Sequence, residues 1–300
     1  MHVVLLGALG QLGRLVERST PRGVKLSAFS SAVCDVTNAA SLRRVLDKAK
    51  PDLVINCSAY TAVDKAESEK ERAFAVNEEG VRNLVASTSP LTRLLHVSTD
   101  FVFDGRANGP YSTDAPVNPL GVYGASKLAG EKVLLEEAPE RSCIVRTAWL
   151  YAADGQNFLN TMLRLMQERP ELRVVNDQRG TPTSAHGLAD VLWRFAMRPE
   201  LKGIYHWTDQ GEATWYEFAC AIQESALRHG LLKRSIPIHP ITTADYPTPA
   251  TRPAYSVLDK SKTYEALGMC GQHWEGALDA VMAIKSEQRK QQQQQQQQQQ

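Results

Sequence analysis

Tyr123 and Lys127 are four residues apart and have side chains suited to proton transfer. They belong to the segment Tyr123-Gly-Ala-Ser-Lys127, where a helical pattern begins, and this spacing places the phenol and the ammonium on one helix face. A free phenol has a pKa of about 10, and a neighbouring cation brings that pKa towards neutrality by stabilising the phenolate. Because Tyr-x-x-x-Lys is also common on exposed amphipathic helices, the pair indicates acid–base chemistry only together with other motifs.

Two hydroxyl residues, Ser98 and Thr99, follow the apolar pair Leu94-Leu95. Ligands of open parallel sheets bind at the carboxyl ends of the strands, which is where these hydroxyls are expected. We predict that Thr99 donates a hydrogen bond to a reacting carbonyl oxygen while Tyr123 protonates it, and that Ser98 faces inward. The alternative is a Ser-Thr-Asp cluster that only caps the end of the strand.

Three glycines, Gly7, Gly10 and Gly13, follow the apolar run Val3-Val-Leu-Leu6 and precede a helical pattern that reaches Glu17. Glycines at such a turn let the backbone approach a diphosphate and let the helix pack closely on the sheet. The helix N-terminus then faces the anion. This arrangement predicts a dinucleotide site.

The elements that position these residues alternate along the first half of the chain. Short apolar runs predict strands at 3–6, 24–29, 53–57, 94–97 and 143–146. Helical patterns cover 40–49, 73–86 and 126–137, and continue at 158–168, 185–197 and 215–228. Buried strands that alternate with helices predict an α/β fold with a doubly wound parallel sheet of the Rossmann type.

The pattern becomes looser after Trp149, where loops rich in proline and threonine separate the helices. We therefore predict a dinucleotide-binding domain at 1–149 and a smaller α/β substrate lobe at 150–290, with some later segments returning to the first domain. Residues 291–300 are a run of glutamine, which cannot form a core. We expect this run to be disordered or artificially added.

Composition excludes several classes of function. The chain has 34 Lys and Arg against 33 Asp and Glu, with 43% hydrophobic residues. This balance is typical of globular proteins and does not favour binding to nucleic acid or to anionic lipid. No apolar run approaches the length of a membrane helix. We expect neither a signal peptide nor a membrane span, and a cytoplasmic location.

The motifs together resemble the extended short-chain dehydrogenase/reductase superfamily and, within it, the dTDP-4-dehydrorhamnose reductase family. The resemblance runs from about Met1 to Leu258. The segments that carry it, besides the glycine turn, are 57–67, 98–103, 123–131, 146–149, 157–158, 177–183, 215–216 and 246–253.

The resemblance implies roles for individual residues. Thr99, Tyr123 and Lys127 would be catalytic. Residues implied to bind the cofactor are Gly7, Gly10, Gln11, Leu12, Asp35, Val36, Ala59, Tyr60, Thr61, Asn77, Ser98, Tyr123 and Lys127, with Asp35 and Val36 at the adenine. Residues implied to contact the nucleotide sugar are Val63, Thr99, Tyr123, Trp149 and Arg252. For Trp149, core packing at a strand end is an equal alternative.

The activity implied is hydride transfer from NADPH, or NADH, to the C4 keto group of dTDP-4-dehydro-L-rhamnose. The segment Leu26-Ser-Ala-Phe-Ser30 has no carboxylate to hold a ribose 2′-hydroxyl, which leans towards NADPH or use of both cofactors. No arginine, however, is clearly placed to hold a 2′-phosphate. Some relatives dimerise through a magnesium ion held partly by the first helix, but Gly13-Arg-Leu-Val-Glu17 does not match. We therefore expect no metal, and a monomer or homodimer.

Two alternatives remain. The chain could be a non-catalytic dinucleotide-binding regulatory subunit, resembling the beta subunit of methionine adenosyltransferase. It could also be another nucleotide-sugar reductase or epimerase, such as one that forms the talose epimer.

Overall fold

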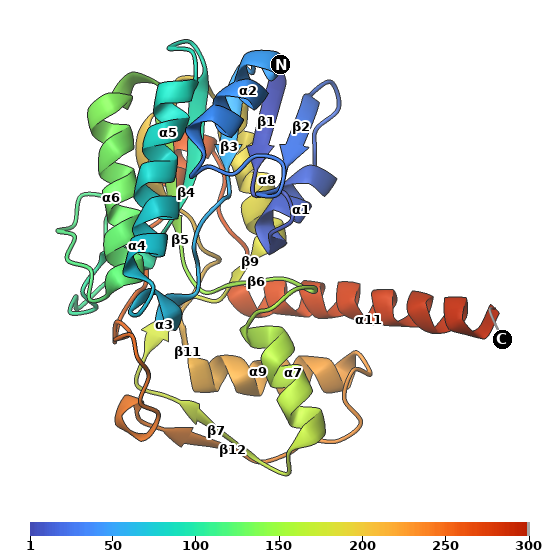
Figure 1. Cartoon of the computed structure of the whole chain (residues 1–300). Coiled ribbons are helices and arrows are strands. Elements are labelled where there is room, and N and C mark those ends of the chain that lie inside the picture. The colour runs from blue at the N-terminus through green and yellow to red at the C-terminus, as the bar shows by residue number, and fades with distance from the viewer. Residues whose placement is uncertain (299–300) are drawn as a thin grey trace.

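A six-stranded, fully parallel sheet lies at the centre of the larger part of the protein (Figure 1). The computed structural model describes residues 1–298. The strand order of the sheet is β10-β5-β4-β3-β1-β2. The strands are β1 (His2–Leu6), β2 (Lys25–Phe29), β3 (Leu53–Asn56), β4 (Arg93–Thr99), β5 (Ser142–Thr147) and β10 (Gly203–His206). The predicted doubly wound parallel sheet is confirmed.

Helices cover both faces of this sheet, so apolar residues of its central strands are buried on both sides. One face packs against α1 (Gln11–Arg18) and α8 (Ala185–Ala196). The other packs against α2 (Ala39–Ala49), α5 (Gly80–Ser87) and α6 (Val122–Glu137). Val3 and Leu5 of β1 belong to the first core, whereas Val4 and Leu6 belong to the second. Successive side chains of a strand point to opposite faces, so in β1 the side chains on both faces must be apolar.

The turn from β1 to α1 needs its glycines. Gly7 has φ +79°, and a Cβ there would lie 2.7 Å from the backbone of Cys57. A Cβ on Gly13 would collide with the carbonyl oxygen of Gly7. The chain therefore turns directly over the end of β3, and α1 begins close to the sheet.

The first domain takes up segments from beyond Trp149. The sixth strand, β10, pairs with β5, and α8 packs against α1. The indole of Trp193 on α8 donates to Val16 O at 2.8 Å. A further helix, α10 (Ser261–Leu267), adds Leu267 to the same core.

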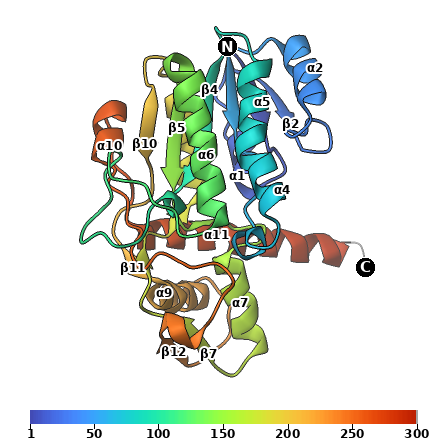
Figure 2. The same cartoon turned by 60° about the vertical axis from the view of Figure 1, so that its left-hand side comes forward.

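The remaining segments form a smaller lobe below the sheet (Figure 2). Its core lies between α7 (Phe158–Glu168), α9 (Trp215–Arg228) and the first turns of α11 (Trp274–Gln298). Its strands pair in twos: β7 (Leu172–Val175) with β12 (Ile238–Ile241), β8 (Arg179–Gly180) with β11 (Ala213–Thr214), and β6 (Leu150–Tyr151) with β9 (Thr183–Ser184).

The helix predicted at 73–86 is interrupted. The chain passes from α4 (Lys70–Phe74) through a wider π-helical turn at Ala75–Glu79 into α5, after the short helix α3 (Val63–Ala66). Such a turn inserts a residue into the helical repeat and often marks a functional position. Asn77 lies in it and is buried.

The glutamine run differs from the expectation of disorder. Helix α11 continues to Gln298, while residues 299–300 lie outside the described residues. The buried residues Trp274, Leu278 and Met282 anchor the start of this helix, and glutamine has a favourable helix propensity that extends it. Within residues 1–298, no helix combines the length and apolar character needed to cross a membrane.

Candidate active site

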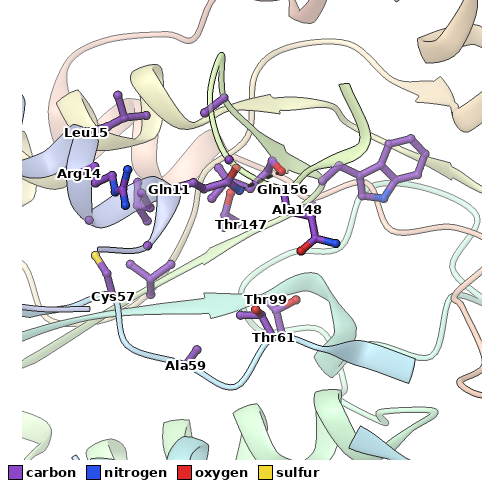
Figure 3. Close-up of a pocket in the computed structure, with 18 of the residues that line it drawn as sticks. Gln11, Arg14, Leu15, Cys57, Ala59, Thr61, Thr99, Thr147, Ala148 and Gln156 are labelled. Carbon is purple, nitrogen blue, oxygen red and sulfur yellow. Dashed lines mark hydrogen bonds between the residues drawn. The ribbon is translucent and has the colours of Figure 1, made fainter. Parts of the chain in front are cut away.

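A pocket of about 660 Å³ opens where the carboxyl ends of β1, β3, β4 and β5 meet the N-terminus of α1. Figure 3 shows Gln11 and Arg14 of α1 on one side and Ala59 and Thr61, from the loop after β3, on the other. Residues from beyond β5, including Trp149 and Gln156, complete the wall. The pocket therefore lies at the edge of the sheet where open α/β folds bind ligands.

The α1 end of this pocket is suited to an anion. The N-cap residue, Gly10, has no side chain to satisfy the first backbone N–H groups, and the first turn carries no acidic residue. The basic side chains of Arg14 and Arg18 also line the pocket. Unpaired N–H groups, the helix dipole and two cations fit a diphosphate, so the site fits a dinucleotide on chemical grounds.

Tyr123 and Thr99 come together at the other end of the pocket. The Thr99 hydroxyl donates to Asp100 Oδ1 at 3.0 Å and accepts from Phe101 N at 3.2 Å. Loss of water around the phenol raises the pKa of Tyr123 to about 12; a hydrogen bond with Thr99 opposes this rise and Asp100 adds to it. The phenol thus keeps its proton at neutral pH. Thr99 also caps the short helix that follows, so the capping alternative describes the same residue.

Lys127, four residues after Tyr123 on α6, is almost fully buried. Its Nζ donates to Val97 O at 2.7 Å and lies 3.4 Å from His96 Nε2. Burial lowers the pKa of Lys127 to about 8, while Glu131 and Cys57 act in the opposite direction. These contacts of Lys127 are with β4 rather than with Tyr123, and desolvation is the largest influence on the pKa of the Tyr123 phenol. The expected lowering of the Tyr123 pKa by Lys127 therefore stays a prediction.

Asn77 joins the loop after β3 to the helix that carries Tyr123. Its side chain accepts from Tyr60 N at 2.9 Å, donates to Tyr60 O at 3.0 Å and donates to Ser126 Oγ at 2.9 Å. The π-helical turn aims the amide at this loop. Glu67 fixes the start of α6 in the same way, because its Oε1 accepts from Val122 N at 2.9 Å.

Known proteins match almost the whole chain. The family model described as the RmlD substrate binding domain matches residues 1–286. The dTDP-4-dehydrorhamnose reductase of Aggregatibacter actinomycetemcomitans is 41% identical over 290 residues, covering 94% of this chain and 98% of that protein. The chain belongs to the RmlD substrate binding domain family.

Solved structures agree with this family. A dTDP-4-dehydrorhamnose reductase from Clostridium acetobutylicum has a TM-score of 0.88 and 36% identity, covering 95% of this chain and 99% of that one. The Bacillus anthracis reductase, solved in complex with NADP, has a TM-score of 0.87 and 34% identity, covering 93% and 98%.

Against this RmlD-family fold, most of the predicted site residues meet in the pocket. Those that line it are Gly10, Gln11, Leu12, Ala59, Thr61, Val63, Ser98, Thr99, Tyr123, Lys127 and Trp149. Gly7 shapes the turn beneath the lining, Asn77 holds the loop, and the Tyr60 hydroxyl donates to Glu69 at 2.8 Å. Asp35 accepts from Thr37 and Val36 packs on Gly80; neither is among the residues that line this pocket, and their contact with the adenine stays a prediction.

Arg252, predicted from the sequence to contact the substrate, forms an ion pair with Asp64. Its guanidinium pairs with both carboxylate oxygens of Asp64, with Nη2 to Oδ2 at 2.9 Å, and also donates to Ala250 O. This pairing lowers the pKa of Asp64. The pair attaches the loop 246–253 to α3, which begins with the pocket residue Val63. A role for Arg252 at the substrate stays a prediction.

Several residues of the pocket are not among those predicted from the sequence. The sequence places Asp100 only in the Ser-Thr-Asp cluster at the strand end, but the residue is buried, and burial raises its pKa to about 6 against hydrogen bonds from Ser256 and Thr99. Arg14 and Arg18 have the i, i+4 spacing that would have revealed a basic face on the cofactor helix. Cys57, Gln156 and His186 also line the pocket. Cys57 begins the segment 57–67 but has no predicted role, and no motif signals Gln156 or His186.

Proposed function

We propose that this protein is a dTDP-4-dehydrorhamnose reductase, which reduces the C4 keto group of dTDP-4-dehydro-L-rhamnose to give dTDP-L-rhamnose. One observation carries the proposal: Thr99, Tyr123 and Lys127 line the same pocket as the uncapped N-terminus of α1. A proton donor and a diphosphate site in one cavity are what nucleotide-dependent ketone reduction requires. The family membership supports the sugar nucleotide as substrate.

Each residue has a distinct task in the proposed reaction. Bound NADPH would supply the hydride. Tyr123 would give its phenolic proton to the alkoxide that forms at C4. Thr99 would turn its hydroxyl hydrogen from Asp100 Oδ1 to that oxygen and hold it by a hydrogen bond. Lys127 would hydrogen-bond the nicotinamide ribose and favour the phenolate that remains on Tyr123. Trp149 and Val63 would bound the sugar-nucleotide side of the pocket.

NADPH is the preferred cofactor in this proposal, with NADH also possible. The strand β2 ends at Phe29 without a carboxylate for a ribose 2′-hydroxyl, and that carboxylate is the feature that usually selects NADH. The Bacillus anthracis relative, crystallised with NADP, supports the same choice. The oligomeric state proposed is a monomer or homodimer.

The proposal is tested with enzymatically made dTDP-4-dehydrorhamnose as substrate. The steady-state rate of NADPH oxidation is followed by absorbance at about 340 nm. Parallel reactions contain NADH in place of NADPH. We expect oxidation only when the keto sugar is present, and a higher kcat/KM with NADPH. No oxidation with either cofactor would refute the proposed activity.

Two further measurements address the alternatives. Proton NMR of the product gives the coupling at C4, which distinguishes rhamnose from its talose epimer. A regulatory subunit would instead bind NADPH without oxidising it and would co-purify with a synthetase. We expect the rhamnose coupling and turnover by the isolated chain.

A further inference from the structure

His96 is a buried ionisable residue that the proposed mechanism leaves without a role. It lies on β4, one residue before the pocket-lining Val97, and is 2% exposed. Its ring spans two partners, with Nδ1 3.1 Å from Asn56 Nδ2 and Nε2 3.4 Å from Lys127 Nζ. The imidazole therefore connects the end of β3 to the buried cation of the site.

A backbone group fixes the orientation of the Asn56 amide. The Ser58 N–H donates to Asn56 Oδ1 at 3.0 Å, and the Ser58 hydroxyl donates to the same oxygen. Because a backbone N–H can only donate, Oδ1 must be the atom on that side. The NH₂ group of Asn56 is thus the one that faces His96.

The Asn56 orientation determines which ring nitrogen of His96 carries the proton. The NH₂ group donates to Nδ1, so Nδ1 must present its lone pair. A neutral imidazole has one N–H and one acceptor nitrogen, and the proton must therefore be on Nε2. Burial, together with the positive charge of Lys127, lowers the pKa of His96 well below its usual range, so the ring stays neutral.

An Nε2–H group is a poor neighbour for an ammonium. A lysine ammonium has three donors and no acceptor, whereas a neutral amine has a lone pair that can accept from Nε2–H. The other partner, Val97 O, accepts from Nζ in either state. The His96 side of the site therefore favours the amine over the ammonium.

We propose that His96, oriented by Asn56, is a positioning residue that presents an N–H donor to Lys127 and so weakens the hold of Lys127 on its proton. This inference rests on the proposed function, in which Lys127 binds the ribose and influences Tyr123. Its consequence is that Lys127 changes between ammonium and amine within the working pH range, which lets proton transfer at Tyr123 couple to Lys127.

Other groups around Lys127 act on the same equilibrium. Glu131, on the same helix, favours the ammonium, but its carboxylate is already paired with Arg146 of β5 at 2.6 and 2.8 Å. Cys57, from the loop after β3, has a pKa raised to about 12 by burial. The groups on the pocket side are Tyr123, with a pKa of about 12, and Asp100, with a pKa of about 6. Of Cys57, Asp100, Tyr123 and Lys127, it is thus Lys127 whose pKa lies between 7 and 10.

Asn56→Asp reverses the direction of the chain of hydrogen bonds. One carboxylate oxygen still accepts from Ser58 N–H, but the other is an acceptor and forces the imidazole proton onto Nδ1. Nε2 then accepts from the Lys127 ammonium. His96→Gln supplies an uncharged comparison, since its amide can turn an oxygen towards Nζ. We expect both variants to raise the Lys127 pKa by about one unit, a tenfold change in proton affinity.

The test uses NADPH binding by the full chain, measured by NADPH fluorescence from pH 7 to 10, so it needs no keto sugar. Affinity for the anionic cofactor should weaken as pH rises through the Lys127 pKa. In both variants the midpoint of this loss should lie about one pH unit higher than in the wild type. His206→Gln is the matched control, because His206 is another buried histidine, on β10, whose Nδ1 lies 3.1 Å from Tyr111 O. It should show the wild-type midpoint.

NMR of ¹³C,¹⁵N-histidine-labelled protein reads the tautomer directly. We expect Nε2–H at His96 in the wild type and Nδ1–H in Asn56→Asp. An Nδ1–H tautomer in the wild type, or midpoints that do not move in either variant, would overturn the proposal. If the tautomers and midpoints are as expected but no keto sugar is reduced, the proposed activity is wrong while the control of Lys127 protonation stands.

Discussion

The indole of Trp149 lies flat against that of Trp215, with ring centroids 3.5 Å apart and planes inclined by 6°. Trp149 follows β5 and has the left-handed φ of 47°, whereas Trp215 begins α9 in the smaller lobe. Gly180 completes the arrangement, because a Cβ there would lie 2.5 Å from the Trp149 ring. The two alternatives for Trp149 are therefore not exclusive: its ring is packed and it also lines the pocket.

Trp215→Ala should weaken binding of the nucleotide sugar. The stack contributes about 1 kcal/mol to holding the Trp149 ring in its orientation. If that contribution is lost from substrate binding, KM for the keto sugar should rise roughly fivefold. The NADPH dissociation constant should stay near that of the wild type. Steady-state kinetics at saturating NADPH measure the first quantity and fluorescence titration the second. Trp215→Phe keeps an aromatic partner and should show a smaller effect; an unchanged KM in Trp215→Ala would contradict this account.

Tyr123→Phe should lower kcat by about 10²- to 10⁴-fold, since it removes the proton donor and leaves the ring in place. NADPH binding should change little, because the ring still fills its place beside Phe101. The matched control is Tyr205→Phe, which loses a hydroxyl from β10, where the ring packs on Phe195. NADPH oxidation with the keto sugar compares the three proteins. Near-normal turnover by Tyr123→Phe would exclude the phenol as the acid.

Gly13→Ala should disturb the turn between β1 and α1, because the added methyl would collide with Gly7 O. We expect a loss of about 1–3 kcal/mol in the free energy of unfolding, typical of overpacking, and at least roughly tenfold weaker NADPH binding, since α1 must move. Gly109→Ala adds a methyl with no heavy atom within 4 Å and should change neither property. Thermal melts and fluorescence titration give the comparison.

Asp279 should stabilise the contact between α11 and α9 in a pH-dependent way. Hydrogen bonds from Arg228 and then Ser225 lower the pKa of Asp279 to about 2. A depressed carboxyl pKa contributes stability that is full above the unfolded pKa of about 4 and is lost as pH falls towards 2. The carboxylate is 44% exposed, so after screening the contribution is at most about 1 kcal/mol.

Asp279→Asn should therefore melt below the wild type at pH 7, with a difference that shrinks below about pH 4. The control Asp47→Asn, at an exposed position of α2, should change melting little. Melting temperatures across pH 3 to 7 provide the measurement. A difference that stays constant down to pH 3 would mean that the amide disturbs packing rather than removes a charge.

Most of the secondary structure could be predicted from local pattern. The strands at 3–6 and 53–57 and the helices at 158–168 and 215–228 agree with the structure within a residue. The π-helical turn around Asn77 could not be predicted, because it depends on contacts with Tyr60 and Ser126 that are distant in sequence. The helical course of residues 291–298 was missed for a related reason, since the packed start of α11 carries it.

The sequence by itself determined the chemistry of the site and its fold class. Short continuous apolar runs that alternate with helical patterns imply the parallel sheet. The glycine turn, Thr99 and the Tyr123–Lys127 pair are readable because each lies within one short segment. Tertiary structure alone decided which groups surround them. It brought Asp100 and Arg14 to the pocket and stacked Trp215 on the pocket residue Trp149. It also paired Arg252 with Asp64 and placed His96 between Asn56 and Lys127. These contacts depend on how strands and lobes pack in space, and no local pattern encodes that packing.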